Sequence, residues 1–251
     1  MTSPELAGSA ALVTGATSGI GRAVALSLAV RGAHVIVGGR DAARGDAVIT
    51  AIRSAGGKAD LLLGDLADAD AVRAMARQAT ELSGGHVDIL VNNAAVYPAH
   101  GRTPELTHED FGNCYAVNVE APFILVAELC PAMAARGRGA VVNVLSMAGR
   151  FGMPGFALYG SSKAALLLLT KAWTAEFGPR GVRVNAVSAG PTRTEGTEAF
   201  GGGLDRLAAA APAGRPARPE EIAAAITYLV GGDAGFVQGA VLDVDGGRNA
   251  T

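Results

Sequence analysis

Short apolar runs that are rich in β-branched residues alternate along the chain with longer stretches that have helical periodicity. Near-continuous apolar runs of this kind are typical of strands buried on both faces of a parallel sheet. The pattern favours an α/β fold, a doubly wound parallel sheet of about seven strands with helices on both faces. The predicted strands are Ala10–Thr14, Val35–Val37, Asp60–Leu63, Ile89–Asn92, Val141–Leu145, Arg183–Val187 and Val241–Val244. The predicted helices are Ile20–Arg31, Ala42–Ala55, Asp68–Leu82, Thr107–Ala135, Tyr159–Phe177 and Pro219–Val230.

Local signals support several helix boundaries. Asp68 is suited to cap one helix, and Thr107 with Asp110 three residues later matches a capping box at the start of another. Pro219 is expected in the first turn of the last helix. The region 191–218 is rich in glycine and proline and is too long for an ordinary connection. Within a single domain that covers residues 1–251, we interpret this region as a substrate loop or lid.

Composition narrows the class of partner. A chain of 251 residues with 49% hydrophobic content can bury a large core as one domain. The formal net charge of −2 comes from charges spread along the chain, which argues against a nucleic-acid partner and favours a small molecule. Cys114 and Cys130 have neither metal-ligand nor redox spacing, so we predict no metal site and interpret both as core thiols in a reducing compartment.

The sequence shows neither a secretory signal nor a membrane-spanning segment. The N-terminus does not resemble a secretory signal, and the longest apolar runs fall short of the roughly 20 residues that a membrane span needs. We therefore expect a soluble, cytoplasmic protein without a membrane partner.

Three glycines, Gly15, Gly19 and Gly21, lie between the first predicted strand and the first predicted helix. Glycine permits positive φ and a close approach to the backbone, and a helix N-terminus offers unpaired N–H groups to an anion. The loop therefore indicates either a tight turn or a bound pyrophosphate, and by itself it does not decide between them.

Further motifs add a family resemblance. TGxxxGIG at 14–21, GDL at 64–66 and NNAA at 92–95 resemble the single-domain branch of the short-chain dehydrogenase/reductase family, with a Rossmann-like fold, over about residues 10–247. The resemblance implies that Asp65 contacts the adenine amino group and that the NNA turn holds the central strand beside the adenosine ribose. Taken alone, these residues could equally be turn residues that satisfy local backbone groups. The implied dinucleotide contacts are Thr14, Gly15, Thr17, Ser18, Gly19, Ile20, Gly21, Asp65, Leu66, Asn92, Ala94, Tyr159, Lys163, Gly190 and Thr194.

The end of the second strand indicates which dinucleotide binds. Where NAD-using proteins of this kind have an acidic residue for the ribose diol, this chain has Gly39, followed by Arg40. An arginine can pair with a 2′-phosphate, and the missing carboxylate removes repulsion against it. We predict that NADP(H) is preferred, with NAD(H) possible; alternatively, Arg40 only faces solvent.

Four residues match the family's catalytic set. YGSSK at 159–163 places Tyr159 and Lys163 on one face of a helix, Ser146 ends a strand, and Asn118 lies inside a helix. A ketone that accepts hydride builds negative charge on its oxygen, so a positioned proton donor is needed there. Tyr159 would be this acid or base, and the Lys163 ammonium would lower its pKa.

The resemblance implies the remaining roles. Lys163 would also hold the nicotinamide ribose, Ser146 would orient the substrate oxygen, and Asn118 would anchor a water that links Lys163 to solvent. The sequence thus predicts an oxidoreductase that interconverts a ketone and a secondary alcohol.

The chain departs from the family pattern after the sixth strand. Ala189 replaces a proline, which is expected to loosen the turn, and Thr192 replaces a branched apolar residue. The segments 95–103, 148–158 and 191–212 are expected to select the substrate in an apolar pocket with few polar anchors. Their side chains of interest are Tyr97, Phe151, Met153, Phe156 and Phe200, with charges at Arg102, Arg150 and Arg193.

Other functions remain possible from the sequence alone. The chain could be a catalytically silent regulator or scaffold that senses a dinucleotide, or an NAD-dependent alcohol dehydrogenase. An enoyl reductase would normally separate its tyrosine and lysine more widely. Relatives of this kind are commonly homotetramers, so we expect a tetramer or dimer in which Thr107–Ala135 and Tyr159–Phe177 pack against their symmetry mates.

Overall fold

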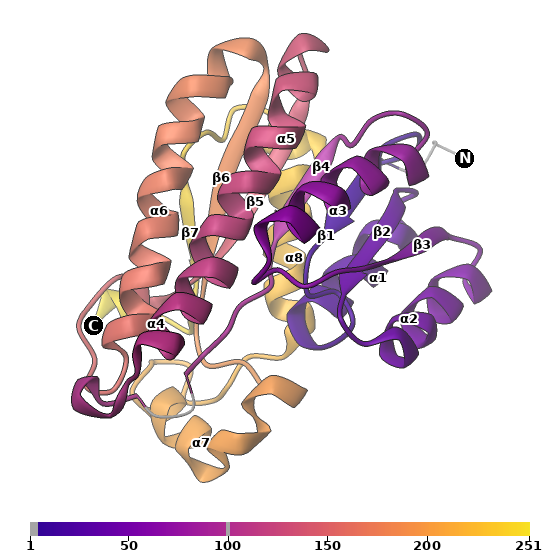
Figure 1. Ribbon diagram of the computed structural model, residues 1–251. Coiled ribbons are helices and arrows are strands. Elements are labelled where there is room, and N and C mark those ends of the chain that lie inside the picture. The colour runs from indigo at the N-terminus through magenta and orange to yellow at the C-terminus, as the bar shows by residue number, and fades with distance from the viewer. Residues whose placement is uncertain (1–4, 99–100) are drawn as a thin grey trace.

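The computed structural model describes residues 5–98 and 101–251 and contains a parallel sheet with strand order β3-β2-β1-β4-β5-β6-β7. β1 pairs with β2 on one side and with β4 on the other, so the strand order reverses beside β1. Ligands of open α/β sheets bind beyond the carboxyl ends of the strands at such a switch point. The predicted fold class is therefore confirmed (Figure 1). The strands are β1 (Ala10–Val13), β2 (His34–Gly39), β3 (Lys58–Leu63), β4 (Ile89–Asn92), β5 (Gly139–Ser146), β6 (Val182–Ala189) and β7 (Val241–Val244).

Helices cover both faces of the sheet (Figure 1). One layer consists of α1 (Gly19–Val30), α2 (Ala42–Ser54) and α8 (Pro219–Val230); the other consists of α3 (Ala69–Leu82), α5 (Ala121–Ala135) and α6 (Ala157–Phe177). Successive side chains of a strand point to opposite faces. In β1, Ala11 and Val13 accordingly join the core under the first layer, whereas Leu12 joins the core under the second.

The predicted capping residues take their expected places. The Asp68 carboxylate accepts hydrogen bonds from the N–H groups of Asp70 and Ala71 at the start of α3. Thr107 and Asp110 form a reciprocal capping box at the start of α4 (His108–Tyr115), and Pro219 is the first residue of α8. These local interactions satisfy N–H groups that a helix terminus leaves unpaired.

The helix predicted over Thr107–Ala135 is not uniform. α4 is followed by a π-helical turn, Ala116–Glu120, and then by α5. Among the described residues, one helix, His108–Ala135, is long and apolar enough by length and composition to cross a membrane. It packs into the fold with Cys114, Asn118 and Met133 buried, and core helices of soluble proteins have the same composition. We interpret it as a core helix.

The region 191–218 was predicted to be irregular, and this prediction is wrong in part. It contains a 3-10 helix, Glu195–Phe200, and α7 (Gly202–Ala209), whose first turn includes two of the three consecutive glycines. Burial of Leu204 and Ala208 against the rest of the chain stabilises α7 despite these glycines. α7 lies apart from the two helical layers, at the bottom of Figure 1. Shorter 3-10 turns occur at Thr103–Glu105, Met147–Gly149, Gly178–Arg180, Gly232–Ala234 and Arg248–Ala250.

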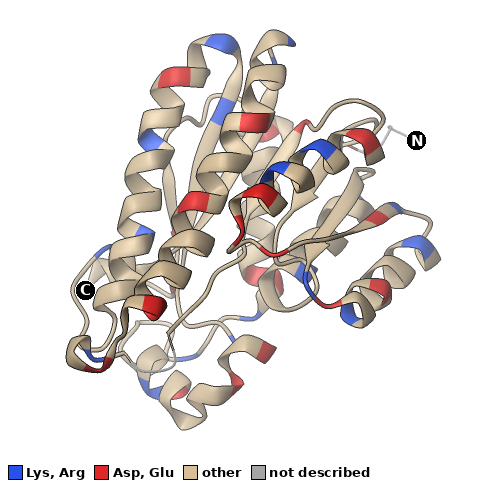
Figure 2. Cartoon of the chain, viewed as in Figure 1, with Lys and Arg blue, Asp and Glu red and all other residues tan. Residues whose placement is uncertain are grey.

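Cys114 and Cys130 are free and buried, as predicted for core thiols. In the view of Figure 2, acidic and basic residues are interspersed over the helices, which matches the charge distribution read from the sequence.

Candidate active site

The three glycines of the loop between β1 and α1 are required by the chain's own packing. A Cβ atom on Gly21 would lie 2.3 Å from the Gly15 carbonyl oxygen, and one on Gly15 would lie 2.9 Å from Ala94 Cα. Gly19 has φ of +51° and faces Thr194, whose Cγ2 would lie 3.0 Å from an added Cβ. The loop is therefore a tight turn pressed against two other segments, and this packing is compatible with a pyrophosphate at the start of α1.

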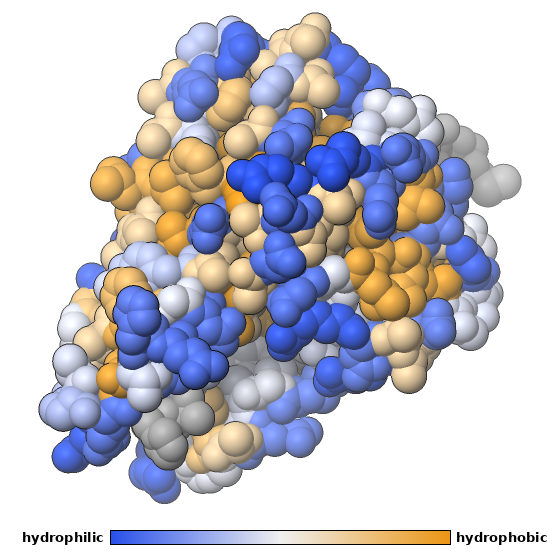
Figure 3. All heavy atoms as spheres, in the orientation of Figure 1, coloured by the Kyte–Doolittle hydropathy of each residue, from blue (hydrophilic) through white to orange (hydrophobic). Residues whose placement is uncertain are grey.

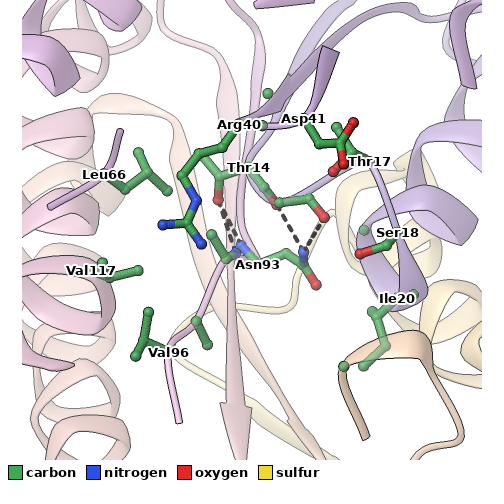
Figure 4. A pocket seen from close by; sticks show the side chains of 18 of the residues that line it. Thr14, Thr17, Ser18, Ile20, Arg40, Asp41, Leu66, Asn93, Val96 and Val117 are labelled. Carbon is green, nitrogen blue, oxygen red and sulfur yellow. Dashed lines mark hydrogen bonds between the residues drawn. The ribbon is translucent and has the colours of Figure 1, made fainter. Parts of the chain in front are cut away.

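The turn is held by Asn93. The sequence analysis named its neighbour Asn92 as a site residue and did not name Asn93. Asn93 Nδ2 donates to the carbonyl oxygens of Thr14 (2.8 Å) and Gly15 (3.2 Å), as Figure 4 shows. The Thr14 hydroxyl accepts from the backbone N–H groups of Asn93 and Ala94. The signal for Asn93 was present in the NNAA motif, where it follows Asn92 directly.

Asn92 lies in the interior of the sheet instead. It is 2% exposed, and its Nδ2 donates to Oδ1 of Asn143 on β5 at 2.8 Å. Asn143 in turn donates to the Thr170 hydroxyl on α6. Asn92 therefore links β4 to β5, whereas Asn93 and Ala94 line the cavity beyond the strands.

That cavity has a volume of about 370 Å³ and extends from the end of β2 to Tyr159. Thr14, Gly15, Thr17, Ser18, Gly19, Ile20 and Gly21 line it, together with Arg40, Asp65, Leu66, Ala94, Tyr159 and Thr194. The structure thus brings together most of the predicted dinucleotide contacts. Asp65 also makes the turn contact that the sequence allowed as an alternative, because its Oδ1 accepts from Ala67 N–H.

Two arginines, Arg40 and Arg44, lie at the β2 end of this cavity, and they differ in whether they form an ion pair. Arg40 is exposed, and within residues 5–98 and 101–251 it has no ion-pair partner. Its guanidinium extends into the pocket in Figure 4. Arg44 is paired with Asp41 at 2.7 Å, and the N–H and side chain of Arg44 hold the pKa of Asp41 below its usual value. Gly39 leaves room for Thr17, since a Cβ there would lie 2.4 Å from Thr17 Cγ2.

The start of α1 carries an unpredicted contact. The N–H of Gly19 donates to Oε2 of Glu195 at 2.9 Å, and Oε1 of the same carboxylate lies 3.0 Å from Arg22 Nη1. An acidic group therefore already meets the N-terminus of the helix that the glycine loop introduces.

Asn118 lies in the π-helical turn, fully buried. Its Oδ1 accepts from Val96 N–H at 2.8 Å, and its Nδ2 donates to Val96 O and to Ser162 Oγ, each at 3.0 Å. Ser162 donates in turn to the carbonyl oxygen of Tyr159. The amide of Asn118 thus joins the segment after β4 to α6, and π-turns of this kind are frequent at functional sites.

Ser146, Tyr159 and Lys163 line one further cavity of about 230 Å³. Tyr159 and Lys163 are one turn apart on α6, and Lys163 Nζ lies 5.7 Å from the centre of the Tyr159 ring. Nζ donates to the Val144 carbonyl oxygen at 2.9 Å. The ammonium therefore has a backbone partner near the end of β5 and also lies close to the Tyr159 ring.

Burial is the largest influence on the pKa values of Tyr159 and Lys163 in this structure. Burial raises the pKa of Tyr159 to about 12; a hydrogen bond with Ser146 opposes the rise, and Cys114 and Tyr97 add to it. Burial also lowers the pKa of Lys163 to about 8, which a weak attraction to Cys114 opposes. Desolvation is the main cause for both groups, because each charged form has lost its water.

Aromatic side chains surround the Tyr159 ring. Tyr97 lies 5.3 Å from Tyr159, 5.4 Å from Phe156 and 5.3 Å from Phe200, measured between ring centres. All four line the 230 Å³ cavity, with Met147, Leu204 and Leu207, which the sequence did not single out. Of the predicted substrate segments, residues 99 and 100 lie outside the described residues.

Two predicted pocket residues, Phe151 and Met153, lie in a separate groove instead. The guanidinium of Arg248 stacks over Phe151, with its carbon 4.7 Å from the ring centre. Two of the three arginines named for these segments form ion pairs: Arg150 pairs with Asp243, and Arg193 pairs with Asp205.

The residue that replaces the proline lies in the sheet. Ala189 is the last residue of β6, in register with Ser146 and Val244. Gly190 is needed where the chain passes Asp245, since an added Cβ would lie 2.6 Å from Asp245 Cα. Gly190, Thr192 and Thr194 all line the smaller cavity.

Comparisons with known proteins agree with this geometry. A family model described as Enoyl-(Acyl carrier protein) reductase matches residues 15–249. A solved structure described as a short chain dehydrogenase/reductase family protein is 45% identical, has a TM-score of 0.91, and matches over 98% of this chain and 100% of that chain. This chain is a short-chain dehydrogenase/reductase.

Two other members of the short-chain dehydrogenase/reductase family carry more specific descriptions. Cis-4-hydroxycyclohexanecarboxylate dehydrogenase from Sinomonas cyclohexanicum is 39% identical, over 96% of each chain. A short chain dehydrogenase from Burkholderia cenocepacia, solved in complex with NADP, is 35% identical with a TM-score of 0.90, over 98% of this chain and 99% of that one. The resemblance found in the sequence is confirmed, and the chain is an oxidoreductase of the dehydrogenase/reductase type.

The residues of this short-chain dehydrogenase/reductase fit the NAD(P) cofactor of its family. An anionic group, the Glu195 carboxylate, already accepts a hydrogen bond at the start of α1, where a phosphate group is favoured. At the other end of the same cavity, Arg40 presents a cation without an ion-pair partner among the described residues. Anion-binding groups thus stand at two points along one cavity that ends at Tyr159.

Proposed function

We propose that this protein interconverts a ketone and a secondary alcohol by hydride transfer with NADP(H). The observation that carries the proposal is the convergence of Ser146, Tyr159 and Lys163 on a cavity that also reaches the glycine loop through Ile20. Bound NADP(H) would supply the hydride in reduction and accept it in oxidation. The chain itself must then bind the substrate oxygen and move one proton.

Tyr159 would be the proton donor in the reducing direction. Its raised pKa keeps the phenol protonated throughout the neutral range, so it can donate to the oxygen on which negative charge develops. Ser146, which lines the same cavity as Tyr159, would meet the same oxygen and fix its orientation. In the oxidising direction Tyr159 would act as a base, and the positive charge of the nearby Lys163 would favour the phenolate.

The role proposed for Asn118 needs one change. The sequence suggested that Asn118 anchors a water, but both polar atoms of its side chain are already bonded to Val96 and Ser162. We propose that the side chain fixes the π-turn and that any water in the proton path is held by backbone groups there. This keeps the proton path next to Lys163 without requiring Asn118 to release its partners.

The preference for NADP(H) rests on charge at the end of β2. Arg40 is free to pair with a 2′-phosphate, and Gly39 supplies no carboxylate to repel it. The nearby carboxylate of Asp41 is compensated by Arg44 at 2.7 Å. The NADP complex of the Burkholderia cenocepacia relative supports the same choice.

The proposed substrate is an uncharged ketone with an apolar or aromatic substituent. Among the described residues that line the 230 Å³ cavity, Lys163 is the one with a charged side chain, and it belongs to the catalytic set. A carboxylate or phosphate on the substrate would therefore lack a counter-charge, which is costly in an apolar pocket. Tyr97, Phe156 and Phe200 instead offer aromatic surface around Tyr159.

We further propose that the protein acts in the cytoplasm as a homo-oligomer. Both cysteines are free thiols, which suits a reducing compartment. Large apolar side chains are exposed on three consecutive helical segments, at Phe111, Phe123 and Leu168. Figure 3 shows apolar residues at the surface over the middle of α6. Such a surface is typical of a contact between subunits.

Two alternative functions predict different results in assays of cofactor binding and turnover. A catalytically silent dinucleotide sensor would bind the cofactor without turnover, and an enoyl reductase would act on a carbon–carbon double bond. The four-residue interval between Tyr159 and Lys163, with Ser146 beside them, favours chemistry at an alcohol or ketone.

The test is a calorimetric titration with NADPH and NADH, followed by turnover assays with uncharged aromatic and alicyclic ketones. We expect NADPH to bind at least about tenfold more tightly than NADH, and Arg40→Asp to remove this preference. Tyr159→Phe should bind NADPH normally and lose turnover by about 10²–10⁴-fold. Equal binding of both dinucleotides would contradict the NADP(H) preference. Turnover retained by Tyr159→Phe would contradict the mechanism, and binding without turnover would favour the sensor.

A further inference from the structure

Glu195 accepts a hydrogen bond from a backbone N–H at the start of α1, a helix that is far away in the sequence. Gly19 is the first residue of α1, and its N–H donates to Glu195 Oε2 at 2.9 Å across 176 positions of sequence. Ser18, the N-cap of this helix, makes no side-chain capping hydrogen bond. The carboxylate of Glu195 therefore replaces a local cap, at the positive end of the helix dipole.

The backbone around Glu195 holds its carboxylate in this position. Thr194 and Thr197 form a reciprocal capping box at the start of the 3-10 helix Glu195–Phe200. Thr197 also donates to the Thr192 carbonyl oxygen at 2.9 Å. Thr194 packs so closely on Gly19 that an added Cβ there would lie 3.0 Å from its methyl carbon. The contact is thus a built junction between the region 191–218 and the glycine loop.

Two anionic groups cannot share one backbone N–H. Under the proposed function, the pyrophosphate of NADP(H) is the anion expected at the start of α1. We propose that Glu195 occupies the pyrophosphate position in the free protein, so that binding of the dinucleotide must displace it and thereby move the region 191–218. This inference rests on the proposed function, and it adds a residue that opposes cofactor binding.

The second partner of Glu195 also changes on displacement. Arg22 Nη1 lies 3.0 Å from Glu195 Oε1, so removal of the carboxylate leaves a cation beside the glycine loop. The two side chains are 47% and 39% exposed, and an ion pair at that exposure contributes little stability. The junction can therefore open at modest cost, whereas a buried ion pair would block the cavity permanently.

Glu195 is charged under ordinary conditions. Hydrogen bonds from its own N–H and from that of Gly19, together with the nearby Arg22 and Arg44, lower its pKa, and partial burial opposes this effect. A glutamine at this position keeps the size of the side chain and removes the negative charge. Glu195→Gln is therefore the variant that isolates the competition.

The experiment measures NADPH affinity and association rate for the full-length protein by calorimetry and stopped-flow fluorescence. Relative to the wild type, Glu195→Gln should bind about tenfold more tightly, mainly through faster association. Glu198→Gln is the matched control, because Glu198 lies on the same 3-10 helix and its side chain makes no contact with α1 among those described for residues 5–98 and 101–251. Its affinity should stay within about twofold of the wild type.

The possible outcomes separate this inference from the proposed function. Unchanged or weaker NADPH binding by Glu195→Gln, with normal binding by the wild type, would overturn the inference alone. Failure of every variant to bind NADPH, with intact circular dichroism and thermal unfolding, would overturn the proposed function and the inference with it. Glu195→Ala is the second variant; it should also bind more tightly, and weaker binding by a folded Glu195→Ala would count against the inference.

Discussion

Gly21 and Gly112 are both glycines inside helices, but the space around them differs. A Cβ on Gly21 would lie 2.3 Å from Gly15 O and 2.5 Å from Asn93 Nδ2, whereas one on Gly112 would meet nothing within 4 Å. Gly21→Ala should therefore lower the free energy of unfolding by about 1–3 kcal/mol. Gly112→Ala should raise it by about 0.5–1 kcal/mol, because alanine loses less backbone entropy in a helix. Urea unfolding of both variants tests this, and equal effects would contradict it.

Lys163 makes stability depend on pH. Its pKa falls from 10.5 to about 8 on folding, so between these values the unfolded chain binds more protons than the folded one. The free energy of unfolding should therefore rise with pH from 8 toward 10.5. Tyr159 acts in the opposite direction, but only between its ordinary value of 10 and about 12, because its pKa is raised on folding.

Lys163→Met should remove this pH dependence. Between pH 8 and 10 the wild type should gain about 2 kcal/mol relative to the variant. Lys171→Met, on the exposed side of the same helix, is the control and should leave the dependence of the wild type unchanged. Urea unfolding at several pH values gives the measurement. A constant difference between the wild type and Lys163→Met across this range would disprove the expected linkage.

Single residues also set the limit of sequence-based prediction of the site. Asn92 and Asn93 are adjacent, but only Asn93 reaches the glycine loop, because Asn92 ends β4 inside the sheet whereas Asn93 is the first residue beyond the strand. The motif identifies the pair and does not assign their directions. Phe151 was expected in the pocket only because it is aromatic. It lies in a separate groove, where the guanidinium of Arg248, almost one hundred positions later in the sequence, stacks on its ring.

At the scale of elements, the helix His108–Ala135 is joined to its neighbours through one irregular turn. Asn118 joins this turn to both backbone groups of Val96 and to Ser162 on α6. Asn118→Ala should lower the free energy of unfolding by about 2–4 kcal/mol, since the partly buried backbone groups of Val96 and the buried Ser162 hydroxyl lose their partner. Asn113→Ala, at an exposed position in α4, should change it by less than about 0.5 kcal/mol. Similar losses in the two variants would refute this role.

Elements differ in how far the sequence predicts them. The central strands of the sheet, such as β1 and β4, were recognisable because they are short runs of mainly apolar, fully buried residues. The π-turn was not recognisable, since helix-forming residues flank it on both sides and only the contact with Val96 marks it. α7 was missed for the opposite reason, because its glycines disfavour a helix locally and burial of Leu204 and Ala208 overrides them.

At the scale of the whole molecule, the exposed apolar side chains are the feature that most needs a partner. Phe111 and Phe123 are each 51% exposed and Leu168 is 67% exposed, on α4, α5 and α6. We expect light scattering to give a mass about two or four times the monomer mass of 25.1 kDa, as for a dimer or a tetramer. Leu168→Glu should lower that mass, because a charge would be buried in the contact.

Leu63 provides the control for this prediction. It is 48% exposed on β3, at the edge of the sheet, so Leu63→Glu should leave the mass unchanged. A wild-type mass of 25.1 kDa would disprove the expected assembly, and an unaltered mass for Leu168→Glu would exclude α6 from it.

The contact between Gly19 and Glu195 also has a consequence for biosynthesis. A ribosome that adds 5–20 residues per second needs about 9–35 s to translate the 176 positions between them. During this interval the nascent chain contains the glycine loop and the sequence of α1, but the carboxylate that will meet them does not yet exist. A denatured full-length chain that refolds never passes through such a state. In a nascent chain, the glycine loop can therefore meet anions before Glu195 has been synthesised. In a refolding chain, Glu195 is present from the start.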